Sequence, residues 1–451
     1  MLKVYNTASR KIERFKPQGK IVKIYTCGPT VYGFQHIGNY ASYIYWDLLI
    51  RVLKADGYKV KRVLNFTDVG HLTSDADSGE DKLEKGAARE GKSVYEIAKF
   101  YGDDFMRNFN ALNLIKPEVI AHATDYVEDD MRAVDEMTKN GFTYETSDGI
   151  YFDTGKFEHY ADFAKLDLAG LHAGARVSFS DEKHLPSDFA VWKFIKPDEK
   201  HAMRWEYLGK PGYPGWHLEC STIIEKELGA PIDIHTGGID HIPVHHTNEI
   251  AQTYAMTGHE LARYWLHCNF ITIDGEKISK SLGNIYTLDD LAERGFSAMD
   301  FKMWVLSGHY QGTRNFTFES LAGAQARRLA WRNRIAECYQ TKNQTQAEEP
   351  AFDRILEAVN DNLNSPEAFA LIDTLDLTLD DWQKIDDLFG LNLINDSPNL
   401  DEKVLELISK REKARTEKDF ALADQIRDEL VARGITLKDT PNGPIWQYLK
   451  D

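Results

Sequence analysis

Hydrophobic and polar positions in the first part of the chain follow strand spacing, then helix spacing, then strand spacing again. Residues 20–26 are rich in β-branched and aromatic side chains and predict a buried strand. Residues 27–38 contain several glycines and a proline and predict a loop. Apolar residues then recur at helical intervals from Asn39 to about Ala55, and Lys59–Phe66 alternates as a second strand. A strand, Gly-rich loop, helix and strand form a βαβ unit, so we expect an α/β fold with a Rossmann-type parallel sheet.

The pattern then changes several times. Residues 68–92 are polar and predict a long surface loop, and residues 93–140 have helical spacing. Short mixed signals over 142–210 are typical of an inserted α+β lobe. Strand-like runs return at Ile232–His235 and Asn269–Ile273, around a helix near His246–Thr257, and predict the second half of the sheet.

After about residue 291 the spacing is almost wholly helical, ending in a charged helical hairpin. The catalytic domain is therefore expected to be split by an insertion and followed by helical-bundle and small C-terminal domains. We divide the chain into a first half of the sheet domain (1–110), an inserted lobe (111–210), the second half (211–290), connecting helices (291–330), a helical bundle (331–400) and a terminal module (401–451).

Composition narrows the class of protein. The 451 residues include 54 Lys and Arg against 71 Asp and Glu, which gives a net charge of −17. This acidic balance argues against a protein that coats DNA or binds membranes through excess positive charge. It still allows a local RNA-binding face. Four cysteines in so long a chain are not a disulfide framework. The first residues lack an apolar signal core, and no run reaches the ~18 apolar residues of a membrane span. We expect a soluble, cytoplasmic monomer with no membrane partner.

Two loops carry candidate phosphate chemistry. Thr30 and His36 lie just before a helix N-terminus, where Gly38 allows close approach and unpaired N–H groups attract phosphate. Lys277 and Lys280 lie three residues apart in a Ser- and Gly-containing loop suited to closing over a polyphosphate. Each alone also reads as an ordinary turn or a solvated loop.

Together the loops resemble the two signatures of class I aminoacyl-tRNA synthetases, usually written HIGH and KMSKS. The chain has His36-Ile-Gly-Asn39 and Lys277-Ile-Ser-Lys-Ser281, in the family order. Asn39 replaces the second His but keeps a polar amide, and Ile278 for Met is conservative.

Four further side chains form a candidate metal site. His245 and Glu249 are four residues apart on a predicted helix, so both project from one face. With Cys27 and Cys220 they make a plausible zinc set, and His246 ranks second to His245. Because no CxxC pair fixes the site, each cysteine alone also reads as a small buried residue.

Several segments resemble cysteinyl-tRNA synthetases over nearly the whole chain. They are Cys27-Gly-Pro-Thr-Val-Tyr, Pro214-Gly-Trp-His-Leu-Glu-Cys220, Gly237-Gly-Ile-Asp240, His245-His-Thr-Asn-Glu249 and the run from Arg415 to Arg427 with Trp446. After Asp68 the chain departs from the family pattern, with an expanded loop that includes His71, Asp75 and Asp77.

The resemblance implies an ATP-dependent ligation of L-cysteine to tRNA through cysteinyl-adenylate. It implies one Zn²⁺ per chain on Cys27, Cys220, His245 and Glu249 that also binds the substrate sulfur, and Mg²⁺ with ATP. For ATP it implies Thr30, His36, Gly38, Asn39, Gly238, Asp240, Lys277 and Lys280, with His36 and both lysines catalytic. For the amino acid it implies Cys27, Gly28, Thr67 and Trp216.

The resemblance also implies that the helices over 291–330 contact the tRNA stem and that the terminal module binds the cysteine-specific tRNA at its GCA anticodon. Its candidate contacts are Arg411, Arg415, Arg427 and Trp446. A cysteine ligase with an amino-sugar acceptor, as in mycothiol synthesis, and a catalytically silent zinc- or RNA-binding paralogue stay as alternatives. A zinc hydrolase is disfavoured because no HExxH motif is present.

Overall fold

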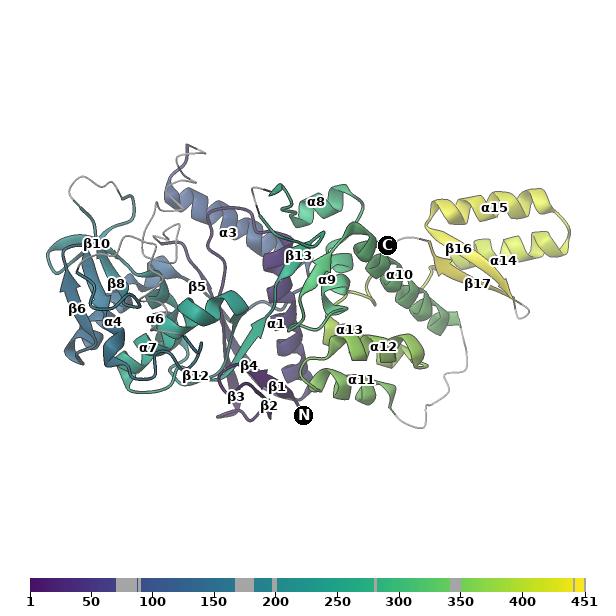
Figure 1. Ribbon diagram of the computed structural model, residues 1–451. Coiled ribbons are helices and arrows are strands. Elements are labelled where there is room, and N and C mark those ends of the chain that lie inside the picture. The colour runs from purple at the N-terminus through teal and green to yellow at the C-terminus, as the bar shows by residue number, and fades with distance from the viewer. Residues whose placement is uncertain are drawn as a thin grey trace.

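The computed structural model describes residues 1–69, 87, 91–166, 182–196, 201–279, 282–340, 350–440 and 443–449 (Figure 1). Its central element is a five-stranded sheet with the order β12-β11-β3-β4-β5, in which every neighbouring pair is parallel. The strands are β3 (Ile21–Thr26), β4 (Lys59–Phe66), β5 (Val119–His122), β11 (Ile232–Gly238) and β12 (Ala262–Cys268). The predicted Rossmann-type parallel sheet is confirmed.

Helices cover both faces of this sheet because its buried strands are apolar on both sides. Ile24 of β3 packs in one core cluster with α1 (Ile37–Ala55) and α3 (Val94–Ala111). The next residue, Tyr25, packs on the other face with side chains of α6 (Trp216–Glu227). Alternation along β3 therefore builds a doubly wound domain.

Two strands were misassigned from the sequence. The helical pattern expected over 93–140 is interrupted by β5, which pairs with β4 and extends the parallel sheet. The expected strand at Asn269–Ile273 lies outside this sheet, and β12 takes its place. Five of the seven residues of β12 in sequence, Tyr264–Cys268, are buried without a break, so the segment shows no alternation.

Short strands make two smaller sheets in the sheet domain. These are β1 (Lys3–Asn6) with β2 (Lys11–Arg14), and β14 (Glu276–Lys277), β13 (Ile271–Ile273) and β15 (Arg314–Phe316). The second of them carries Lys277 at its edge. Helix α7 (Thr247–Thr257) connects β11 to β12.

The expected inserted lobe is present as an antiparallel sheet with its own apolar cluster. The order is β6 (Thr143–Thr146), β7 (Gly149–Phe152), β8 (Phe189–Phe194), β10 (Lys210–Pro214) and β9 (Trp205–Tyr207), with α4 (Val127–Lys139) packed beside them. In Figure 1 the lobe lies at the far left, at the opposite end of the molecule from the C-terminal unit.

The C-terminal part is mainly helical, as predicted. It contains α8 (Leu288–Glu293), α9 (Ala298–Leu306), α10 (Phe318–Gln340), α11 (Ala351–Asn360), α12 (Ser365–Thr374), α13 (Leu379–Phe389), α14 (Glu402–Thr416) and α15 (Phe420–Ala432). The helical hairpin α14–α15 is followed by an unexpected strand pair, β16 (Ile435–Thr440) and β17 (Gly443–Tyr448). No helix in the described ranges combines the length and the apolar character that crossing a bilayer requires.

Candidate active site and metal centre

The candidate site lies where β3 and β11 end side by side. Thr26 of β3 pairs with Thr236 of β11, and the backbone N–H of Cys27 donates to the Thr236 carbonyl at 3.4 Å. The chain leaves these two neighbouring strands toward opposite ends of the sheet, which is a topological switch point. Open α/β sheets bind their ligands at the carboxyl edge of such a point.

The loop after β3 is held against β4. The Gly28 amide donates to Asn65 Oδ1 at 2.8 Å, and a Cβ at Gly28 would lie 1.6 Å from the Asn65 carbonyl oxygen, so only glycine fits there. Thr30 and Thr67 form an isolated parallel bridge, with the Thr67 amide donating to the Pro29 carbonyl at 3.1 Å. The structure therefore brings Gly28, Thr30 and Thr67 together at the sheet edge.

His36 begins helix α1. Its Nδ1 accepts a hydrogen bond from the Asn39 amide at 3.3 Å, while Asn39 Oδ1 accepts from the His36 amide at 3.1 Å. This reciprocal capping box satisfies two N–H groups of the helix start. Burial lowers the pKa of His36 to about 4, so its imidazole is neutral at pH 7. The Asn39 side chain thus stabilises the start of α1, because its amide oxygen accepts the hydrogen bond from the His36 backbone.

The lysine loop meets the same helix start. The Ile37 amide donates to the Tyr286 carbonyl at 2.8 Å, and a Cβ at Gly38 would lie 2.7 Å from Ile278 Cδ1. Asn284 spans the loop, accepting from the Ser279 amide at 2.8 Å and donating to the Lys277 carbonyl at 3.1 Å. Lys277 is exposed at the end of β14, and Lys280 lies outside the described residues.

The four expected metal ligands come together. One ligand atom from each of Cys27, Cys220, His245 and Glu249 lies within 4.8 Å of the others. His245 lies in the π-helical turn Ile242–His246 just before α7, and its Nε2 is 2.7 Å from Glu249 Oε1. Cys220, on α6, is 2% exposed. Two thiols, an imidazole and a carboxylate match the donors that zinc prefers.

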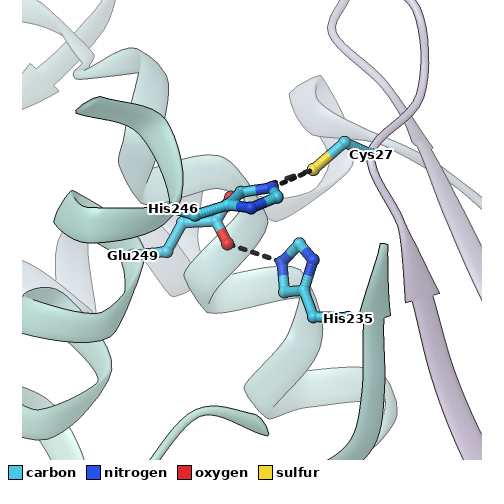
Figure 2. Close-up of side chains that lie close together, drawn as sticks. All are labelled: Cys27, His235, His246 and Glu249. Carbon is cyan, nitrogen blue, oxygen red and sulfur yellow. Dashed lines mark hydrogen bonds and ion pairs between the residues drawn. The ribbon is translucent and has the colours of Figure 1, made fainter. Parts of the chain in front are cut away.

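A second quartet shares two of these residues. His235 of β11 and His246 join Cys27 and Glu249 within the same 4.8 Å limit, and Figure 2 shows their four side chains converging. His246 Nε2 lies 3.5 Å from Cys27 Sγ, and His235 Nε2 lies 2.6 Å from Glu249 Oε2. His246 was the ranked alternative, but His235 was not anticipated.

Burial and neighbouring charges shift the pKa values of the side chains in this cluster. Burial raises the pKa of the Cys27 thiol, and both Cys27 and burial raise that of Cys220. Burial opposes ionisation of Glu249, yet His235 and His245 hold its pKa well below the usual range. A metal ion displaces protons from such thiols when it binds. The half-buried thiol of Cys27 and the buried thiol of Cys220 beside a buried carboxylate therefore fit a thiophilic dication.

Two further histidines contact the rings of His245 and His246. His217 Nδ1 lies 2.9 Å from His245 Nδ1, and His246 Nδ1 lies 2.8 Å from His267 Nε2, which places polar partners on the ring edges. Such outer contacts orient ligands and set their tautomers. The Trp216 ring stacks on His245 with centroids 4.9 Å apart, so this expected cysteine-pocket residue adjoins the metal cluster. His217 and His267 were not anticipated from the sequence, because each contacts a ring that belongs to a different element.

The two remaining expected ATP residues lie at the end of β11 and in the turn after it. Gly238 ends the strand, and Asp240 lies in the short turn Ile239–His241. A Cβ at Gly238 would lie 2.3 Å from Asp240 Oδ1, so the glycine makes room for this carboxylate. Both residues therefore stand at the same edge of the sheet as Cys27.

The expected RNA contacts in the terminal module differ in exposure. Trp446 is 3% exposed and packs with Ile426 and Leu430, so it is a core residue of this unit and offers no ring face to a base. Arg411 is also buried, and its guanidinium pairs with Asp439 at 3.3 Å. The side chains of Arg415 and Arg427 are 39% and 53% exposed and stay as predicted contacts.

Comparisons with known proteins match this architecture. Residues 14–326 match the family described as tRNA synthetases class I (C) catalytic domain, and residues 397–446 match the cysteinyl-tRNA ligase anticodon binding domain. The chain is 42% identical to cysteine--tRNA ligase 1 of Burkholderia lata, covering 98% of this chain and 96% of that protein. It is 38% identical to the cysteine--tRNA ligase of Treponema denticola, covering 99% and 100%.

A solved structure shares the fold. The methionyl-tRNA synthetase of Mycobacterium tuberculosis in complex with methionyl-adenylate superposes with a TM-score of 0.59 at 18% identity, covering 83% of this chain and 89% of that one. The sequence matches extend over nearly the whole chain and include both the catalytic and the anticodon-binding domain. The chain therefore belongs to the cysteine--tRNA ligase family of class I aminoacyl-tRNA synthetases.

Proposed function

We propose that this enzyme joins L-cysteine to its cognate tRNA in two steps, through cysteinyl-adenylate, and selects cysteine at the buried metal cluster. The observation that carries the proposal is the convergence of Cys27, Cys220, His245 and Glu249 beside the loop that holds His36. In the first step the cysteine carboxylate attacks the α-phosphate of ATP and releases pyrophosphate. In the second, the terminal ribose hydroxyl of tRNA attacks the mixed anhydride and releases AMP.

The two signature segments handle the ATP phosphates. His36, held neutral by burial, can donate a hydrogen bond but carries no charge, and the start of α1 supplies backbone N–H groups. Lys277 and Lys280 supply the positive charge that stabilises the developing charge on the phosphates and pyrophosphate. Thr30, Gly38, Asn39, Gly238 and Asp240 complete the proposed nucleotide contacts. Phosphoryl chemistry of this kind depends on positioning and electrostatics, with Mg²⁺ accompanying ATP.

The metal cluster accounts for specificity. When bound, Zn²⁺ would coordinate the substrate sulfur as thiolate, a donor that it prefers strongly over the hydroxyl of serine. An apolar pocket separates such similar side chains by only ~1–3 kcal/mol. We favour the quartet with Cys220 over that with His235 and His246, because it holds two soft sulfur donors. Gly28, Thr67 and Trp216 would position the rest of the amino acid.

We propose tRNA as the acceptor because the chain matches an anticodon-binding domain over residues 397–446, which disfavours the amino-sugar alternative. Arg415 and Arg427 would contact the GCA anticodon loop. The division into six parts, the single zinc per chain, the monomeric state and the cytoplasmic location are part of this proposal. A catalytically silent paralogue is the remaining alternative.

The first step can be tested alone. Pyrophosphate exchange into ATP is measured with cysteine or serine, using protein loaded with zinc and protein treated with a chelator. We expect exchange with cysteine in the zinc-loaded protein only, and little with serine. Equal exchange with serine would contradict metal-based selection, and an absence of exchange with either amino acid would leave the silent paralogue.

A further inference from the structure

Exposed aromatic rings lie close together near His36, in and beside the loop between β3 and α1. Phe34 is 55% exposed and Phe100 of α3 is 44% exposed, and their ring centroids lie 6.0 Å apart. Both rings rest against Tyr101, which is buried, at 5.0 and 5.1 Å. Lys92 Nζ lies 4.5 Å from the centre of the Phe100 ring. We call Phe34, Phe100 and Tyr101 with Lys92 the aromatic patch.

The patch has a fixed place relative to the active site. Phe34 lies two residues before His36, in a segment that Gln35 fastens by donating from Nε2 to the carbonyls of Thr30 and Gly33, both at 3.3 Å. Phe100 lies on α3, a long helix capped by Ser93. The exposed rings are therefore held by ordered elements, and their exposure is a property of the folded domain.

A hollow continues the patch toward the inserted lobe. It has a volume of about 450 Å³ and is lined by Ala87, Lys92, Ser93, Val94, Tyr95, His201 and Ala202. Residues 201 and 202 lie shortly before the lobe strand β9 (Trp205–Tyr207), and Lys92 belongs also to the aromatic patch. In Figure 1, α3 crosses the top of the molecule between the lobe and the region of β13 and α8.

We propose that the aromatic patch is a stacking platform for the unpaired 3′ end of the acceptor tRNA. This inference rests on the proposed function, in which that end must reach the carboxyl edge of the sheet. Aromatic faces bind unstacked bases of any sequence, and a nearby lysine offers a positive charge to the backbone phosphates. Phe34 lies two residues before His36, and Lys92 of the patch also lines the hollow that His201 and Ala202 complete, an arrangement that suits a single strand lying along this face.

The test separates RNA binding from amino-acid activation. Phe34→Ala and Phe100→Ala are compared with Phe34→Tyr, which keeps the ring, and with Ile12→Ala, whose side chain is 56% exposed on β2, away from the active-site loop. Three quantities are measured: pyrophosphate exchange, single-turnover transfer of cysteine from preformed adenylate, and affinity for a cysteine tRNA transcript with or without its last four nucleotides.

We expect the alanine variants to slow transfer about ten-fold while exchange stays within two-fold of the wild type. They should weaken binding of the full transcript but not of the shortened one, and Phe34→Tyr and Ile12→Ala should behave as wild type. Unchanged transfer and binding would overturn the proposal, as would an equal loss with the shortened transcript. Failure of the proposed function itself would appear differently, as wild-type protein that gives no cysteine-dependent exchange, and the binding comparison would still decide the role of the patch.

Discussion

Gly38 and Ile278 bring the two signature segments into direct contact, since a methyl group at Gly38 would lie 2.7 Å from Ile278 Cδ1. The same methyl group would lie 3.0 Å from the His36 ring, so we expect Gly38→Ala to turn the Ile278 side chain aside, to crowd the His36 ring and to lower the rate of adenylate formation. Gly323→Ala is the matched control, because Gly323 also lies in a helix but has open space around its Cα. That control should keep full activity. Pyrophosphate exchange measures both, and equal activity of the two variants would refute the contact.

The metal cluster predicts which substitutions remove zinc. Cys220→Ser and His245→Ala should each abolish the retention of zinc through gel filtration, because each removes one of four ligands from a buried site. Cys338→Ser should retain the metal, since Cys338 Sγ contacts the Leu377 carbonyl in the helical part of the chain. Elemental analysis of the purified proteins gives the stoichiometry.

The same measurement chooses between the two quartets. His246→Asn should keep one zinc per chain if Cys220 and His245 are ligands, because His246 then only neighbours the site. Loss of zinc in His246→Asn together with retention in Cys220→Ser would instead assign the metal to the quartet with His235 and His246.

The low pKa of His36 gives a pH dependence with a defined sign. Burial lowers it to about 4 in the folded protein, whereas an unfolded histidine has a pKa of ~6.5. Well above pH 6.5 the ring is neutral in both the folded and the unfolded state, so it contributes nothing to the pH dependence of the free energy of unfolding. As the pH falls toward 4 the unfolded state alone binds the proton, so the free energy of unfolding should fall by about 2 kcal/mol by pH 5. His36→Asn, which keeps a capping oxygen, should lose less stability than the wild type over this range in denaturant titrations. An identical pH dependence of stability in the wild type and in His36→Asn would contradict the burial of a neutral His36.

A buried ion pair joins α1 to α9. Lys302 Nζ lies 2.9 Å from Asp47 Oδ2, both side chains are fully buried, and Arg51 Nε also donates to Asp47 Oδ2 at 2.7 Å. Asp47→Ala leaves two cations without their carboxylate and should lower the free energy of unfolding by about 3–5 kcal/mol. Asp103→Ala, which removes the exposed pair with Lys99, should cost less than ~1 kcal/mol. Similar losses in the free energy of unfolding for both variants would show that the buried pair stabilises the fold no more than the exposed pair does.

Local patterns in the sequence located the first half of the catalytic domain well. The strand at 20–26 and the strand Lys59–Phe66 match β3 and β4, because both are bounded by clear turn residues. Strand β12 was missed because a parallel strand buried on both faces shows no alternation. Helical spacing likewise concealed the four-residue strand β5.

The site shows the same division between local and distant contacts. The four-residue spacing of His245 and Glu249 placed both on one side of the metal cluster, and the structure brings Cys27 and Cys220 to them. The contact of His235 with Glu249 depends on how β11 packs against α7, which spacing does not encode. Trp446 was predicted to contact tRNA, but it is 3% exposed and lies in the unpredicted strand pair β16–β17.

Selection of cysteine at the metal cluster is tested most directly by aminoacylation of a tRNA transcript bearing the GCA anticodon, with labelled cysteine and excess serine, in zinc-loaded protein and in Cys220→Ser. We expect the zinc-loaded protein to charge the transcript with cysteine at a rate that serine leaves unchanged, and Cys220→Ser to lose this activity. Charging with serine, or undiminished charging by Cys220→Ser, would contradict selection at the metal cluster.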